Sequence, residues 1–192
     1  MQTIFDLCTP RDEVLQGELS EDIFAARLQD VMNGKADPVY GDPATFFDNT
    51  YPTAGLKTLL ADALGRLTGK AAGKNAVIRL ETAFGGGKTH NLIALYHVAS
   101  GQAPQSVQSL LGKGVALPKP GQIKIAGVVG SDLDATVGID HPDDKIKTFT
   151  LWGELAYQLG GRAGYALVKE SDEWKSAPGT GLFETLSGDG PT

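Results

Sequence analysis

A run of three glycines followed by lysine and threonine constrains the fold of this chain more than any other sequence feature. The run lies in TAFGGGKTH, residues 82–90, between an apolar stretch, NAVIRLE at residues 75–81, and an amphipathic helix predicted over residues 89–100. The apolar stretch has the composition of a short buried strand. Strand, glycine loop and helix in this order are the setting of phosphate-binding loops. The sequence therefore predicts an α/β fold with such a loop after its first strand.

The loop matches the phosphate-loop pattern at its end and departs from it at its start. The pattern asks for a glycine, four free residues and then Gly-Lys-Ser/Thr. Gly87, Lys88 and Thr89 fill the last three positions, whereas Thr82 stands where the first glycine is expected. Glycine reaches the positive φ angles that turn backbone N–H groups toward a phosphate. Because a lysine at this position neutralises phosphate oxygens and a Ser/Thr hydroxyl binds Mg²⁺, we expect ATP and Mg²⁺ as cofactors, with Thr89 as the metal ligand.

The candidate nucleotide-binding residues are the loop and one upstream tyrosine: Thr82, Ala83, Phe84, Gly85, Gly86, Gly87, Lys88, Thr89, His90 and Tyr51. Lys88 is also the first candidate for a catalytic role. The alternative is a glycine-rich turn that only begins a helix and leaves Lys88 at the surface. His90 is either a phosphate contact or a histidine on the helix surface, and Tyr51 either packs on adenine or seals the core.

Hydrolysis of ATP by such folds also needs a carboxylate, usually at the end of an apolar strand. The apolar strand predicted after the loop, residues 123–129, is followed by Gly130, Ser131 and only then Asp132. Glu81 ends the strand before the loop, where a solvated strand end is the simpler interpretation. Glu81 and Asp132 are the candidate acids within the chain. The preferred interpretation places the acidic (Walker B) strand beyond residue 192, so that the chain is an N-terminal fragment with no ATPase activity of its own.

Two segments follow from these patterns. Residues 1–50 are predicted to be a helical lead-in, and residues 51–192 the N-terminal part of a P-loop ATPase domain, an incomplete parallel sheet flanked by helices. Leucines at helical spacing predict a helix over residues 56–67. Phe46 and Phe47 lie in a segment rich in proline and glycine, residues 35–52, predicted to be a loop whose aromatic side chains pack on the rest of the protein.

Composition excludes several classes of protein. The chain of 192 residues has 17 basic and 23 acidic side chains, a net charge of −6, so it lacks the strongly basic composition of many nucleic-acid-binding domains. A single cysteine rules out an internal disulfide. The chain has no run of about 18 apolar residues that would cross a membrane, and its start does not have the pattern of a secretory signal. We therefore expect a cytoplasmic protein.

Several stretches together resemble a known prokaryotic family of large ATP-binding proteins. They are RLETAFGGGKTH, FDLCTPRDEVLQGELSEDIFAARL, TYPTAGLKTLL, GSDLDAT and TLWGELAYQLGG. The family is described as a domain of unknown function related to the AAA-type P-loop ATPases, and its genes often lie beside those of DNA methyltransferases in anti-phage defence islands. The resemblance implies an AAA-like core, ATP with Mg²⁺, a homo-oligomeric or multi-protein assembly and an indirect association with DNA.

Three functions are consistent with these observations. The first is ATP binding, with Mg²⁺-dependent hydrolysis in the full-length protein. The second is a sensor or scaffold that binds ATP without hydrolysing it. The third is a P-loop kinase, for which the sequence shows no acceptor site. GTP is disfavoured because the chain has no Asn-Lys-x-Asp guanine signature.

Overall fold

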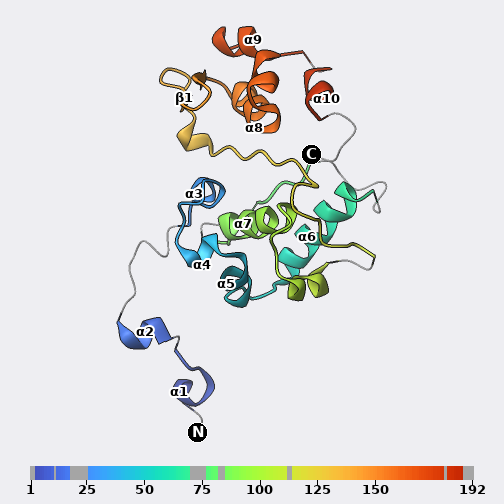
Figure 1. The fold of residues 1–192 in the computed structure, drawn as a ribbon. Coiled ribbons are helices and arrows are strands. Elements are labelled where there is room, and N and C mark those ends of the chain that lie inside the picture. The colour runs from blue at the N-terminus through green and yellow to red at the C-terminus, as the bar shows by residue number, and fades with distance from the viewer. Residues whose placement is uncertain are drawn as a thin grey trace.

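The computed structural model describes residues 3–10, 12–17, 26–69, 77–81, 85–111, 114–179 and 181–187. Over these residues the chain is mainly helical, with one sheet of two antiparallel strands. Figure 1 shows three parts: an N-terminal arm, a first body of helices and a second body that carries the sheet. The arm contains the short helices α1 (Ile4–Leu7) and α2 (Asp12–Gln16). None of the helices in the described ranges is both long and apolar enough to span a membrane.

The first body surrounds one hydrophobic core. It consists of α3 (Leu28–Met32), α4 (Pro38–Gly41), α5 (Pro43–Asp48), α6 (Ala54–Leu67), α7 (Lys88–Ala99) and the 3-10 helix η2 (Gln105–Leu110). The α6 helix begins where Thr53 Oγ1 accepts a hydrogen bond from the Leu56 N–H at 3.2 Å. Its leucines recur every three or four residues, and Leu60 and Leu64 are fully buried against Ile93 and other residues of α7. The α6 helix confirms the leucine periodicity in the sequence. The α7 helix forms where it is predicted, but it buries Ile93 and Val98 and leaves Leu92 40% exposed.

The segment predicted as a loop over residues 35–52 contains two short helices. Asp37 and Asp42 cap α4 and α5, and each cap is followed directly by a proline. A proline at the first helical position starts a helix, since the N–H that it lacks would have no partner there. The loop prediction was wrong because it took these prolines as breaks. The expected packing of the aromatics is confirmed, since Phe46 and Phe47 are both buried in the core.

The second body packs helices on a small hairpin. It consists of β1 (Ile139–His141), β2 (Ile146–Thr148), α8 (Leu151–Ala166), α9 (Lys169–Glu173) and α10 (Gly181–Ser187). In the hairpin register, Ile139 is opposite Thr148. The α8 helix breaks at Gly161, with φ 58° and ψ −146°, before it continues to Ala166.

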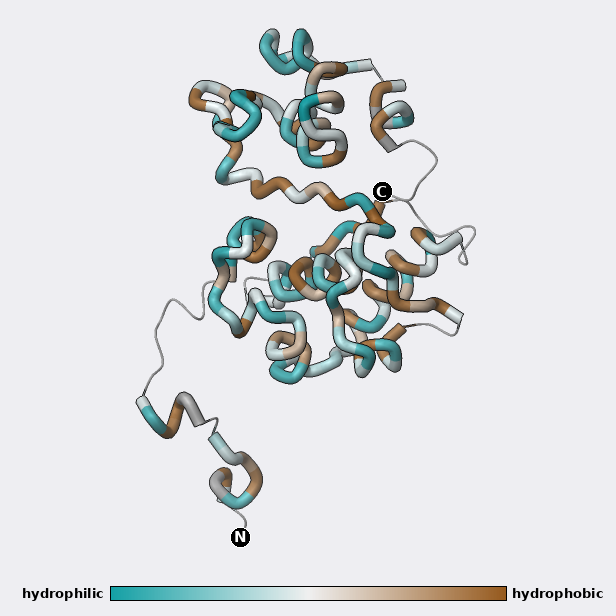
Figure 2. Tube along the Cα trace, in the orientation of Figure 1, coloured by the Kyte–Doolittle hydropathy of each residue, from teal (hydrophilic) through white to brown (hydrophobic). Residues whose placement is uncertain are grey.

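Neither predicted parallel strand has a ladder partner among the described residues. Residues 77–81 and 123–129 are in no regular element, and Figure 2 shows residues 123–129 as a mostly apolar trace between the two bodies. In that segment the backbone of Gly127 hydrogen-bonds to a side chain and not to a neighbouring strand. Its N–H donates to Gln158 Oε1 at 2.8 Å, and its carbonyl accepts from Gln158 Nε2 at 3.0 Å. The parallel sheet therefore stays a prediction.

Candidate functional site

The glycine loop leads directly into the N-terminus of α7. Thr82, Ala83 and Phe84 lie outside the described residues, whereas Gly85 to Thr89 are described and exposed. Gly85 has φ 77° and Gly87 has φ 74°, and Gly86 between them does not have a positive φ. Lys88 then begins the helix. A left-handed residue followed by a right-handed one, as at Gly87 and Lys88, turns successive N–H groups toward one point, which is the geometry of an anion-binding nest.

The loop also has space around its backbone. A Cβ on Gly85 would meet nothing within 4 Å, and one on Gly87 would meet only Asn91 Nδ2 at 3.9 Å. Gly87 is the N-cap of α7, and no side-chain hydrogen bond caps that helix. Because helix N-termini concentrate N–H groups and a partial positive charge, an anion is favoured here. The residues present fit the phosphates of a nucleotide: the backbone is open, and Lys88 and Thr89 follow it directly.

His90 joins α7 to α5. Thr50 Oγ1 donates its one proton to the Phe46 carbonyl at 2.6 Å, so it accepts from His90 Nε2 at 2.9 Å. The His90 ring also lies against the Phe46 ring, with centroids 4.5 Å apart. Burial lowers the pKa of His90, which favours the neutral ring with its proton on Nε2. His90 is therefore half-buried against α5 and not simply a histidine on the helix surface.

Tyr51 is the most exposed aromatic near this contact. Tyr51 is 82% exposed, so the prediction that it seals the core is wrong. The reason is local: Phe46 and Phe47 of α5 already fill the core at this point. Its neighbour Thr50 is the residue that bonds His90.

The two candidate acids each have an arginine partner. Glu81 Oε1 lies 2.6 Å from Arg79 Nε, and both side chains are largely exposed. Asp132 closes the 3-10 helix η3 (Gly130–Asp132), and its carboxylate oxygens accept from Arg27 Nη2 at 3.2 and 3.1 Å. Among the described residues no group of three or more His, Cys, Asp or Glu side chains forms a metal site.

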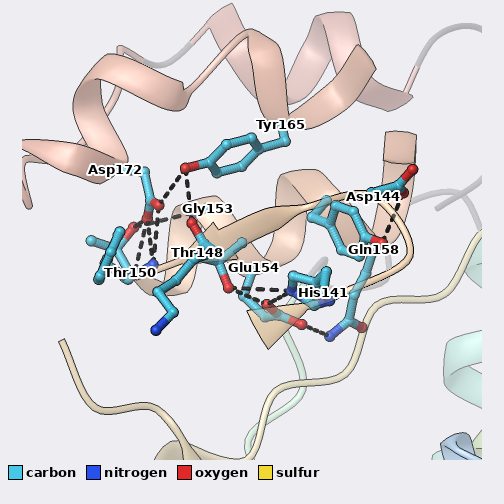
Figure 3. A network of polar contacts seen from close by, with 12 residues as sticks. His141, Asp144, Thr148, Thr150, Gly153, Glu154, Gln158, Tyr165 and Asp172 are labelled. Atoms are coloured by element: carbon cyan, nitrogen blue, oxygen red, sulfur yellow. Dashed lines mark hydrogen bonds and ion pairs between the residues drawn. The ribbon is translucent and has the colours of Figure 1, made fainter. Parts of the chain in front are cut away.

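A buried polar network in the second body was not predicted from the sequence. Figure 3 shows Glu154 of α8 between His141 and Thr148 of the hairpin. Glu154 Oε2 accepts from Thr148 Oγ1 at 2.5 Å and lies 2.9 Å from His141 Nε2, while Gln158 Nε2 donates to Oε1 at 2.7 Å. Glu154 looks in the sequence like any polar residue of an amphipathic helix, and only the hairpin brings His141 to it.

A second carboxylate in this body holds the start of α8. Asp172 is fully buried and accepts from the backbone N–H groups of Phe149 and Thr150 at 3.0 and 2.8 Å. It also accepts from Tyr165 Oη at 3.2 Å, as Figure 3 shows. Burial first, and then the negative charge of Asp172, raise the pKa of Tyr165 to about 12. These contacts organise the fold, because every group involved is satisfied within the body.

A cleft of about 670 Å³ lies between the two bodies, and its lining includes Tyr96, Asp132, His141 and Glu154. None of the loop residues Gly85 to Thr89 lines it. The cleft brings Asp132 close to the Glu154 network but does not connect it to the glycine loop. The structure thus brings His90 and Thr50 together beside the start of α7 and places Asp132 in a cleft that the described loop residues do not line.

Comparison with known proteins gives one result. No curated protein and no solved structure matches the chain. The family described as the DUF499 N-terminal domain matches residues 5–189, which is nearly the whole sequence. The chain therefore belongs to the DUF499 N-terminal domain family, a domain of unknown function.

Proposed function

We propose that residues 85–89 bind the triphosphate of ATP together with Mg²⁺. The observation that supports this most is the alternation of φ at Gly85, Gly86 and Gly87 immediately before a twelve-residue helix. A glycine turn that only begins a helix does not need two left-handed glycines in three residues. In an anion-binding nest, neighbouring residues of opposite handedness direct successive backbone N–H groups at the anion.

Each residue of the loop has a distinct role in this proposal. The backbone N–H groups of the glycines and the first turn of α7 would hold phosphate oxygens. The Lys88 ammonium would stabilise the charge on the β- and γ-phosphates, and the Thr89 hydroxyl would be the protein's ligand to the metal. Bound Mg²⁺ supplies further positive charge between the phosphates. Thr82, Ala83 and Phe84 would form the start of the cradle.

Two versions of this function differ in whether ATP is hydrolysed. An AAA-like hydrolase needs an acid beside the bound metal. A sensor that binds ATP without hydrolysis is the second candidate. It is favoured by one observation on the candidate acids: Glu81 lies in an exposed ion pair, and Asp132 lines a cleft that residues 85–89 do not line. Measuring phosphate release from the 192-residue chain tests whether either acid supports hydrolysis. We expect no phosphate release.

The wider setting is also part of the proposal. An assembly of several subunits, an indirect association with DNA and a role in defence against phage in the cytoplasm follow from the family resemblance in the sequence. They are not needed for the loop to bind a nucleotide.

Titration calorimetry of the chain with ATP tests the binding site. Lys88→Ala should weaken ATP binding about 10- to 150-fold, because a hydrogen bond to a charged group contributes about 1.5–3 kcal/mol. Lys169→Ala is the matched control, since Lys169 is an exposed lysine of α9 in the second body. Removing Mg²⁺ with a chelator should weaken binding to the wild type and to the control alike. Equal ATP affinity in the two lysine variants would refute the site.

A further inference from the structure

Tyr51 combines an exposed ring with a fixed backbone. At 82% exposure it is as accessible as Trp174, the other aromatic side chain left this open among the described residues. An aromatic ring in water usually belongs to a mobile segment or to a binding surface. The residues on both sides of Tyr51 separate these two cases.

Both neighbours of Tyr51 are held by hydrogen bonds. On the N-terminal side, the Thr50 N–H donates to the Phe47 carbonyl at 3.2 Å, and Thr50 Oγ1 donates to the Phe46 carbonyl. On the C-terminal side, the Thr53 N–H donates to the Tyr51 carbonyl at 2.9 Å, and Thr53 caps α6. Pro52 between them fixes its own φ. The backbone that carries the Tyr51 ring is therefore fixed, so little backbone conformational entropy is lost when the ring stacks on a ligand.

The same turn is attached to the helix that carries the glycine loop. Thr50 accepts from His90 Nε2, and His90 follows Thr89 in the first turn of α7. Consecutive Cα atoms are only about 3.8 Å apart, so Tyr51 is next to a residue that contacts the loop helix directly. The Phe46–His90 ring contact strengthens this link between α5 and α7.

We propose that Tyr51 is the stacking platform for the base of the nucleotide whose phosphates bind at residues 85–89, an inference that rests on the proposed function. The loop alone recognises only the polyphosphate. A phenol ring on the turn that contacts His90 adds a flat apolar face, and every base has a complementary π-face. The ligand class is therefore a nucleoside triphosphate with a purine base, because a purine covers more of the ring than a pyrimidine. Stacking does not read the base edge, so ATP and GTP gain equally from Tyr51.

The test compares ATP with inorganic tripolyphosphate, both in the presence of Mg²⁺. Tyr51→Ala should weaken ATP about 5- to 150-fold, the loss expected for one stacked base, and leave tripolyphosphate affinity unchanged. Tyr51→Phe keeps the ring and should restore ATP affinity. Trp174→Ala is the control for loss of an equally exposed aromatic. Thermal unfolding of each variant confirms that the fold is intact, which the exposure of Tyr51 leads us to expect.

The outcomes distinguish the two proposals. If the wild type binds neither ligand, the proposed function fails. If tripolyphosphate binds through Lys88 but Tyr51→Ala leaves ATP affinity unchanged, or weakens both ligands equally, the stacking platform is refuted and the phosphate site stands. If CTP and UTP lose as much as ATP in Tyr51→Ala, the assignment to purines is overturned.

Discussion

The left-handed conformation of Gly87 gives a prediction that links folding to binding. Gly87→Ala places a Cβ at φ 74° without a steric collision, since the nearest atom is Asn91 Nδ2 at 3.9 Å. Its effect is therefore conformational. An L-residue in this region costs about 1–2 kcal/mol. If the substituted loop keeps its shape, this cost lowers the free energy of unfolding. If the loop relaxes to another conformation, the ligand must restore the left-handed turn, and the same cost weakens binding instead.

The sum of the two losses is thus the quantity that the structure predicts. If the loop keeps its shape, the free energy of unfolding falls by about 1–2 kcal/mol and affinity is unchanged. If the loop relaxes, stability is unchanged and affinity for tripolyphosphate falls about 5- to 30-fold. Urea unfolding followed by circular dichroism, with calorimetry on the same samples, measures both terms.

Gly55→Ala is the matched control for this substitution. Gly55 lies in the first turn of α6 with no neighbour within 4 Å of a Cβ and without a positive φ. The change in the unfolded chain is the same for both variants, so it cancels in their difference. We expect Gly55→Ala to stabilise the protein by about 0.5–1 kcal/mol. A Gly87→Ala protein with unchanged stability and unchanged affinity would show that the loop does not hold the left-handed turn.

Two further predictions concern the second body. Gly153→Ala should lower the free energy of unfolding of this body by about 2 kcal/mol or more in urea titrations, because the new Cβ collides with the Asp172 carboxylate. A stability equal to that of the wild type would contradict the position of Asp172. Burial and Asp172 raise the pKa of Tyr165 to about 12, above the value of about 10 for an unfolded chain. The resulting stability is present below about pH 10 and is lost as the pH rises from about 10 to about 12. Melting temperatures across this range should fall more steeply for the wild type than for Tyr165→Phe, and equal slopes would exclude Tyr165 as the cause.

The parts of the molecule that sequence predicts are those governed by local rules. The α6 helix follows from leucine spacing, and the glycine run anticipates positive φ at Gly85 and Gly87. The burial of Phe46 and Phe47 follows from the cost of leaving such rings in water. The short helices α4 and α5 were missed although their Asp-Pro starts are a readable signal.

Other features depend on contacts that no local pattern records. The strands of the hairpin have only three residues each and include Asp, His and Lys, so their composition does not favour a strand. Glu154 meets His141 only because that hairpin folds onto α8. The predicted parallel strands are a different case, since a strand is defined by its partners, and residues 77–81 and 123–129 have none among the described residues.

The arginine partners of the two candidate acids raise the question of whether either acid is available for ATP hydrolysis. The Arg79 and Glu81 side chains are 83% and 67% exposed, and those of Arg27 and Asp132 are 58% and 31% exposed. Exposed ion pairs contribute only about 0–1 kcal/mol. Neither arginine would therefore prevent its carboxylate partner from binding a metal ion. What disfavours them is position, since Glu81 is in an exposed pair and Asp132 lines a cleft that the loop does not reach. Removing Arg27 or Arg79 should consequently leave ATP turnover by the chain at zero, and any turnover that appears would assign the acid to the released side chain.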